Sequence, residues 1–121
     1  MIEDIVGVIL WTENLEGMVR FYRDVLGLRE HSRHGDFVAF EVRPGVRLSI
    51  GRHSRVRGRA QDPYRVMVNL GVKDIHAVYE ELRRRGVSFL RPPEREHWGG
   101  WVATFQDPDG NILQLLQGAS R

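Results

Sequence analysis

Histidine and carboxylate side chains are the groups of this chain that could bind a metal ion or transfer a proton. His31 and His34 are three residues apart, a spacing that presents two imidazoles to one ion only on a helix. The segment around them is typical of a loop or an edge strand, so we interpret this pair as surface residues. A second set could form a displaced metal site or an acid–base site: Glu41, His53, Glu96 and His97.

Other kinds of chemistry have no support in the sequence. The chain has no cysteine, which excludes disulfides, thiolate zinc sites and a cysteine nucleophile. It also has no glycine-rich phosphate loop and no G-x-S-x-G motif. Nucleophilic hydrolysis is therefore not expected.

The composition is that of an ordinary globular domain. The chain has 121 residues, of which 41% are hydrophobic and 28% charged, with a formal net charge of +2. No apolar run approaches the roughly 18 residues that a transmembrane helix needs, and the start of the chain does not resemble a signal peptide. We therefore expect a cytoplasmic protein without a membrane partner.

Two amphipathic helices are predicted about sixty residues apart. Residues 15–28 carry apolar side chains at helical spacing, with Asn14 as the N-cap and Gly27 as the stop. The second helix follows Asp74 and stops at Gly86 by the same signals. This correspondence indicates an internal repeat.

Strand-like runs surround each predicted helix in the same order. Short extra strands at 29–34 and 87–92 belong to the pattern, the second ending at Pro92 and Pro93. The remaining strands are expected at 5–10, 37–42 and 46–50, and again at 64–70, 101–106 and 111–117. The sequence therefore predicts an α+β fold, one domain over 1–121 made of two βαβββ modules, about 1–55 and 62–118, joined by an arginine-rich linker.

One face of each predicted sheet is covered by its helix, and the other is bare. We expect the bare faces to curl around a common cleft, within one chain or between the two chains of a homodimer. Alternation assigns Val6, Val8, Leu10, Val38, Phe40 and Val42 to the helix side. It assigns to the cleft Ile5, Gly7, Ile9, Trp11, Phe37, Ala39, Glu41, Arg47, Ser49, Met67, Asn69, Trp101, Ala103, Phe105, Ile112 and Gln114.

This lining is mostly apolar and aromatic, with a few polar groups, and suits a small organic ligand with flat parts. The alternative is that these side chains fill the interior between the sheets. Trp98, before the glycine pair 99–100, is expected either to cover the ligand or to plug a sheet edge. The predicted ligand-binding residues are Trp11, Phe37, Glu41, Arg47, Met67, Asn69, Trp98, Trp101, Phe105 and Gln114.

Two motifs resemble those of the vicinal oxygen chelate superfamily, which includes glyoxalase I, bleomycin resistance proteins and extradiol dioxygenases. Residues 15–28, LEGMVRFYRDVLGL, are similar to its helix signature, and residues 105–115, FQDPDGNILQL, are similar to its F-x-D-P-D-G-N-x-x-E-L hairpin. The resemblance covers nearly the whole chain and implies tandem βαβββ modules that form a curved mixed sheet around a cleft.

The resemblance also implies four metal-ligand positions, one on the first and one on the last strand of each module. These positions hold Gly7, Ser49, Met67 and Gln114, none of which is a histidine or a carboxylate. Glycine has no donor, and the other three are poor ligands for a hard divalent ion. We therefore expect no family-type metal site and no cofactor.

Taken together, these features favour a homodimer that binds a small, partly aromatic molecule without a metal ion, with sequestration of a drug as in bleomycin resistance proteins. The alternatives are a metal-dependent lyase or dioxygenase with displaced ligands, and a metal-free isomerase with Glu41 as its catalytic base. The arginine-rich segment 52–65 is interpreted as a solvated connector, and nucleic acid is not expected as a partner.

Overall fold

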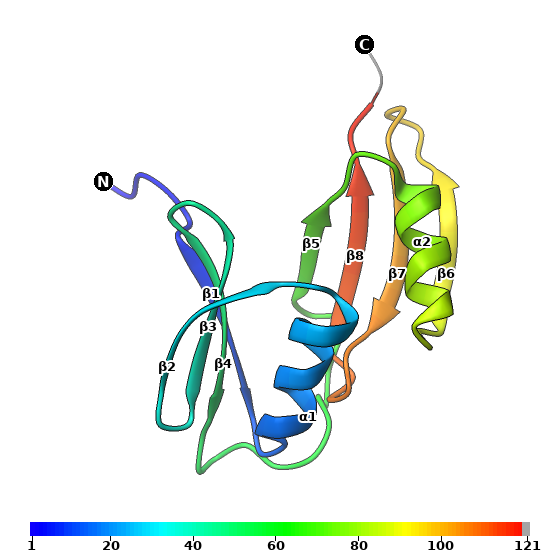
Figure 1. Ribbon diagram of the computed structural model, residues 1–121. Coiled ribbons are helices and arrows are strands. Elements are labelled where there is room, and N and C mark those ends of the chain that lie inside the picture. The colour runs from blue at the N-terminus through cyan, green and yellow to red at the C-terminus, as the bar shows by residue number, and fades with distance from the viewer. Residues whose placement is uncertain (120–121) are drawn as a thin grey trace. The chain divides into compact units, whose positions relative to one another are not determined.

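The computed structural model describes residues 1–119, which divide after Gly58 into two compact units. Each unit contains one four-stranded sheet with helical structure on one face (Figure 1). The predicted α+β fold with two βαβββ modules is confirmed.

The first unit forms a mixed sheet in the order β1-β4-β3-β2, in which β1 is parallel to β4 and the other pairs are antiparallel. A π-helical turn, η1, directly continues α1. The elements are β1 (Gly7–Thr12), α1 (Leu15–Arg20), η1 (Phe21–Val25), β2 (Arg29–His34), β3 (Phe37–Arg43) and β4 (Val46–Arg52).

The second unit repeats this topology in the order β5-β8-β7-β6, again with one parallel pair, β5 and β8. Its elements are β5 (Met67–Gly71), α2 (Ile75–Arg84), β6 (Phe89–Arg95), β7 (Trp101–Gln106) and β8 (Ile112–Gln117). The internal repeat predicted from the sequence is therefore confirmed.

The helix boundaries follow the predicted capping residues. The Asn14 side chain accepts a hydrogen bond from the Gly17 amide at 3.3 Å, and the Asp74 side chain accepts one from the Ala77 amide at 3.1 Å. Gly27 and Gly86 have φ angles of 75° and 93°, the left-handed conformation that ends a helix.

Each helix buries its apolar stripe against one face of its own sheet. In the first unit Met18 and Tyr22 are fully buried, as are Phe40 of β3 and Ile50 of β4. In the second unit Ile75 and Leu82 are buried together with residues of β7 and β8. We call the sheet face that lacks the helix the open face of each unit; in the first unit it carries Gly7, Ile9, Trp11, Phe37, Glu41, Arg47 and Ser49.

Strand β6 does not end at the two prolines as predicted. It continues through Pro92 and Pro93 to Arg95. An edge strand tolerates prolines because one of its sides has no partner, and the β6–β7 register is irregular between Arg91 and Glu94. Two strands also begin later than predicted, β1 at Gly7 and β5 at Met67.

The face predicted for β7 is wrong. Trp101 packs on His76 of α2, with ring centroids 4.9 Å apart, and Phe105 packs on Phe89 at 5.2 Å. Phe89 in turn contacts Tyr79 of α2 at 4.6 Å, so Trp101, Ala103 and Phe105 lie on the helix face.

The cause is a one-residue error in matching the repeats. Phe40 pairs with Leu48 in the first unit, and Phe105 pairs with Leu113 in the second, so Phe37 corresponds to Val102 and not to Trp101. A shift by one residue exchanges the two faces of a strand. Two residues assigned to the helix side of the first unit are also exposed, Val6 at 67% and Val42 at 46%.

The helix-side position of Phe105 can be tested by truncation. Phe105→Ala removes a fully buried ring and should lower the free energy of unfolding by about 3–5 kcal/mol. Leu90→Ala in the neighbouring strand, where the side chain is 52% exposed, should change it by less than about 1 kcal/mol. Urea unfolding of the three proteins measures both, and equal effects would contradict the assigned packing.

Candidate functional site

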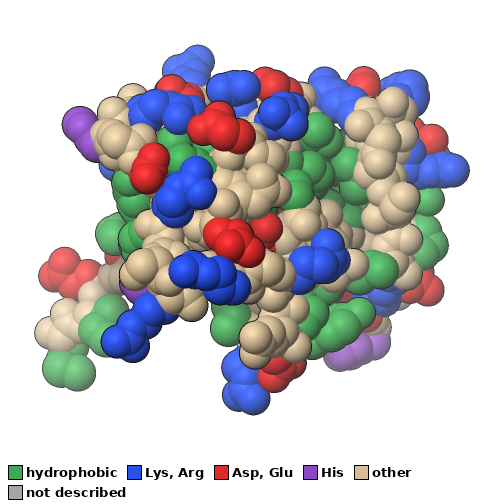
Figure 2. All heavy atoms as spheres, turned by 90° about the horizontal axis from the view of Figure 1, so that it is seen from below, with side chains coloured by type: hydrophobic (Ala, Val, Ile, Leu, Met, Phe, Trp, Pro, Cys, Tyr) green, Lys and Arg blue, Asp and Glu red, His purple; other side chains and the backbone are tan. Residues whose placement is uncertain are grey.

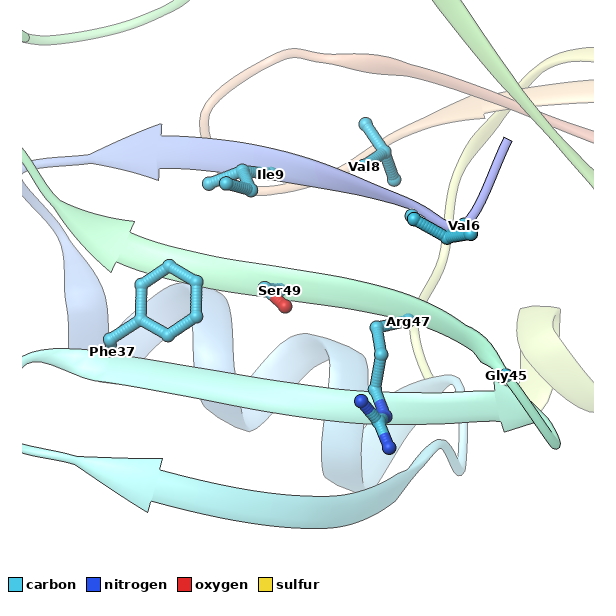
Figure 3. A pocket seen from close by; sticks show the side chains of 8 residues that line it. Val6, Val8, Ile9, Phe37, Gly45, Arg47 and Ser49 are labelled. Carbon is cyan, nitrogen blue, oxygen red and sulfur yellow. The ribbon is translucent and has the colours of Figure 1, made fainter. Parts of the chain in front are cut away.

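A hollow of about 330 Å³ lies on the open face of the first unit, over β1, β3 and β4. Its size is at the lower end of the range for small-molecule sites. We call it the Arg47 hollow; its lining residues are Val6, Gly7, Val8, Ile9, Phe37, Gly45, Arg47 and Ser49 (Figure 3).

The strand register explains why these side chains meet. Across the sheet, Ile9 of β1 lies beside Ser49 of β4, and Ser49 lies beside Ala39 of β3. The neighbouring residues of β4, Leu48 and Ile50, point to the other face and are buried there. Arg47 and Ser49 of β4 therefore belong to the open face.

Arg47 is held at one side of the hollow by two neighbours. Its Nη2 atom lies 2.9 Å from Nε2 of His31 and 3.5 Å from an Oε atom of Glu41. A guanidinium group only donates hydrogen bonds, so Nε2 of His31 is the acceptor and its Nδ1–H donates to the Ser32 hydroxyl at 3.1 Å. The Nε atom of Arg47 is buried and has no hydrogen-bond partner among the described residues.

His31 is exposed, as predicted, but its contact with Arg47 was not predicted. The β2–β3 register shifts between Glu30 and Ser32, and His31 lies inside this irregularity. A bulge changes which way a side chain points, and simple alternation cannot predict it.

Glu41 does not line the Arg47 hollow, although it forms an ion pair with Arg47. It lines a separate hollow of about 400 Å³, together with Gly27, Leu28, Arg29, Val42, Arg43 and Pro44. The two predicted charged site residues therefore face different spaces.

An aromatic cluster lies next to the Arg47 hollow. The rings of Trp11 and Phe37 are 5.9 Å apart, and His53 makes an edge contact with Trp11 at 5.3 Å. Gly51 lies between Trp11 and Phe37 in the sheet, and a Cβ atom there would come within 2.5 Å of the Trp11 ring and 2.8 Å of the Phe37 ring. A glycine is therefore required for these rings to approach the strand.

Replacement of Gly51 by alanine tests the placement of the Trp11 and Phe37 rings. Gly51→Ala should lower the free energy of unfolding by about 1–3 kcal/mol, because the two rings must move. Gly71→Ala is the matched control: Gly71 is also a strand residue, and an added Cβ there meets nothing within 4 Å. Thermal and urea unfolding compare the two, and a Gly51 variant as stable as the Gly71 variant would contradict the ring placement.

The predicted site residues of the second unit do not form one group, because some lie on its open face whereas Trp101 and Phe105 lie on its helix face. Asn69, Gln114 and Thr104 form a row across its open face, and the Gln114 amide donates to the Thr104 hydroxyl at 3.2 Å. Met67 lies beside Ile112 on the same face. Trp98, which is 45% exposed, precedes β7.

The four family-type ligand positions do not fit a catalytic divalent metal ion. Gly7 offers no side-chain donor, and a Cβ atom at this position would lie 2.7 Å from the backbone oxygen of Arg47. Met67 supplies a thioether, while Ser49 and Gln114 supply neutral oxygen atoms. Hard divalent ions prefer carboxylates, and zinc prefers imidazole or thiolate.

The alternative metal set is not assembled either. Glu41 is paired with Arg47, His53 packs on Trp11, and Glu96 accepts a hydrogen bond from Arg91 at 2.6 Å. His97 is the fourth member of that set. Among residues 1–119, no three histidine, aspartate or glutamate side chains form a group that could hold a metal ion.

Arg91 is the centre of a small ionic cluster in the second unit. It donates to Glu94 and to Glu96, and these hydrogen bonds raise the pKa of Arg91 above its ordinary value. These bonds link Arg91 to other residues in and just after the irregular edge strand β6, so the role of the cluster is structural.

The arginine-rich segment 52–65 makes contacts within its own units. Arg52 pairs with Asp36, Arg65 pairs with Asp62, and Arg59 donates to the Pro108 carbonyl at 3.1 Å. Basic and acidic side chains are interspersed on the face shown in Figure 2. These pairs support the interpretation of the segment as a connector. None of the helices in residues 1–119 has the length and apolar character that crossing a membrane requires.

The comparisons with known proteins agree with this architecture. Residues 4–115 match the Glyoxalase/Bleomycin resistance protein/Dioxygenase superfamily, and the chain belongs to that superfamily. A crystal structure of a glyoxalase/bleomycin resistance protein/dioxygenase from Nocardioides is 28% identical, with a TM-score of 0.77 over 99% of this chain and 86% of that chain.

Two curated relatives extend over most of the chain. The uncharacterized protein YetH of Bacillus subtilis (strain 168) is 25% identical over 97% of this chain and 100% of its own length. A probable lactoylglutathione lyase of Synechocystis sp. (strain ATCC 27184 / PCC 6803 / Kazusa) is 26% identical over 89% of this chain and 90% of its own length. The name of the superfamily joins different activities, so the site of this chain must decide between them.

Proposed function

We propose that the chain binds a small organic molecule with an apolar or aromatic body in the Arg47 hollow, without a metal ion, and that binding itself is its function. The observation that carries this proposal is the lining of the hollow: apolar groups around one cation and one hydroxyl group. Such a combination of apolar walls and few polar groups is typical of small-molecule sites.

The hollow supplies apolar contact area for a ligand and two polar side chains that can orient it. Ile9 and Val6 are 47% and 67% exposed, so a ligand that covers them removes apolar surface from water. Burial of apolar surface contributes about 25 cal/mol per Å². The aromatic ring of Phe37 adds a flat contact surface. A protein that acts by sequestration needs this affinity and no reactive group.

Only part of the predicted ligand-binding set belongs to this proposal. Phe37 and Arg47 line the hollow, and Trp11 contacts Phe37. Trp101 and Phe105 are left out because their rings lie on the helix face of the second unit. The roles of Met67, Asn69, Gln114 and Trp98 as ligand-binding residues stay predictions.

A second candidate function is that of a metal-dependent lyase, which the name of the Synechocystis relative favours. The donor set at Gly7, Ser49, Met67 and Gln114 speaks against it, for the reasons given above. An isomerase with Glu41 as base is less favoured, because a ligand in the Arg47 hollow does not meet the Glu41 carboxylate.

Metal analysis separates these functions. Protein purified without an affinity tag should contain less than a tenth of an equivalent of zinc, nickel, manganese or iron. Its affinity for a bound aromatic compound should not change when a chelator is added. A stoichiometric metal ion whose removal abolishes binding would support the lyase and overturn our proposal.

Truncation of the aromatic wall tests the site itself. A set of one-ring and two-ring aromatic compounds is screened by ligand-observed NMR against the full chain. Compounds that bind should lose at least tenfold in affinity with Phe37→Ala, since the ring is a wall of the hollow. Leu90→Ala, in an exposed position of the second unit, should leave binding unchanged. No binder in the set, or equal affinities for the two variants, would contradict the proposal.

A further inference from the structure

We infer that the ligand of the Arg47 hollow carries a carboxylate, which Arg47 binds through guanidinium N–H groups that His31 and Glu41 do not occupy, on an apolar body that lies toward Phe37. The inference rests on the proposed function, because it names the chemical class of the molecule that occupies the same hollow.

The charge of the residues that line the Arg47 hollow favours an anionic ligand. Among the described residues that line the hollow, Arg47 is the one charged side chain, and Ser49 is the one other polar side chain. Glu41, which could have attracted a cation, lines the neighbouring hollow. The lining of the hollow itself therefore carries one positive group and no negative one, and the Glu41 carboxylate contacts only the Nη2 atom of Arg47, at 3.5 Å. This arrangement favours an anion.

The Arg47 guanidinium also has N–H groups that neither His31 nor Glu41 occupies. Both contacts of the Arg47 guanidinium, with His31 and with Glu41, are made through Nη2. Its Nε atom is shielded from solvent and has no partner among the described residues. That atom is out of reach of a ligand, but the Arg47 side chain as a whole is 38% exposed, so its outer N–H groups are available to an acceptor. A carboxylate suits a guanidinium especially well, because its two oxygens match the planar donors.

Glu41 and His31 contact only the Nη2 atom of the Arg47 guanidinium. The Glu41 contact of 3.5 Å is longer than the 2.7–2.9 Å typical of a charge-assisted hydrogen bond. His31 accepts from the same Nη2 atom at 2.9 Å. The two side chains act as positioning residues, and the outer N–H groups that they do not contact remain available for an acceptor from outside.

The arrangement of the lining gives the shape of the ligand. Arg47 and Phe37 lie toward opposite ends of the hollow, with Ser49 between them and Ile9 alongside (Figure 3). A molecule that fills this space has its carboxylate at one end and an apolar or aromatic group at the other. The volume of about 330 Å³ suits a small monocarboxylate.

A pair of probes that differ only in charge tests this inference on the unmodified protein. Calorimetry and ligand-observed NMR compare 3-phenylpropionate with 3-phenylpropionamide, which has nearly the same shape but no charge. We expect the acid to bind at least tenfold more tightly than the amide, because only the acid forms a charge-assisted bond with Arg47.

Variants of Arg47 and Arg43 test whether the preference for the acid over the amide depends on Arg47. Arg47→Gln should reduce the affinity for 3-phenylpropionate at least tenfold and bring it to that of the amide, and Arg47→Lys should retain part of the preference for the acid. Arg43→Gln removes the same charge from the same sheet, but from the other hollow, and should leave both affinities unchanged. Melting temperatures confirm that the variants are folded.

Two results would overturn the inference, and they can be told apart. If acid and amide bind equally well, and Phe37→Ala weakens both, the hollow is a ligand site but Arg47 is not a carboxylate anchor. If neither probe binds and no compound of the aromatic set binds, the proposed function fails together with the inference. Equal loss of acid binding in the Arg47→Gln and Arg43→Gln variants would also contradict a specific role of Arg47.

Discussion

The parallel pairing of β1 with β4 is the constraint on which the rest of the first unit depends. It places Gly7 against Arg47 so closely that a Cβ atom at position 7 would lie 2.7 Å from the Arg47 carbonyl oxygen. The same pairing turns Ile9 and Ser49 to the open face and sends Leu48 and Ile50 into the core. One register thus creates the hollow, presents Arg47 in it and leaves position 7 without a donor atom.

Gly51 is a second glycine that the structure of the site requires. The rings of Trp11 and Phe37 approach the strand because no side chain stands between them. At both positions a missing side chain is a structural requirement. The chain belongs to a superfamily whose scaffold supports several activities, and in this chain the open face of the first unit combines apolar walls with one cation.

Much of the fold could be predicted because local signals and the repeat agreed. Asn14 and Asp74 cap the helices, Gly27 and Gly86 end them, and the order of strands is the same in both units. The face of β7 could not be predicted reliably, since a one-residue shift in matching the repeats moves Trp101 and Phe105 to the helix side.

The candidate site was predicted only in part. Phe37 and Arg47 were found by strand alternation and do line the hollow. Glu41 pairs with Arg47 across β3 and β4, but it lines another hollow. His31 was missed because it lies in a register shift. Irregularities of this kind depend on pairing between strands, which the residue types of one strand do not reveal.

A crystal structure of the untagged protein grown with 3-phenylpropionate tests the central claim most directly. We predict electron density for the compound in the Arg47 hollow, with a carboxylate oxygen within hydrogen-bond distance of the Arg47 guanidinium and the phenyl ring beside Phe37. A metal ion coordinated by side chains of this chain, with the compound bound to it or absent from the hollow, would contradict it.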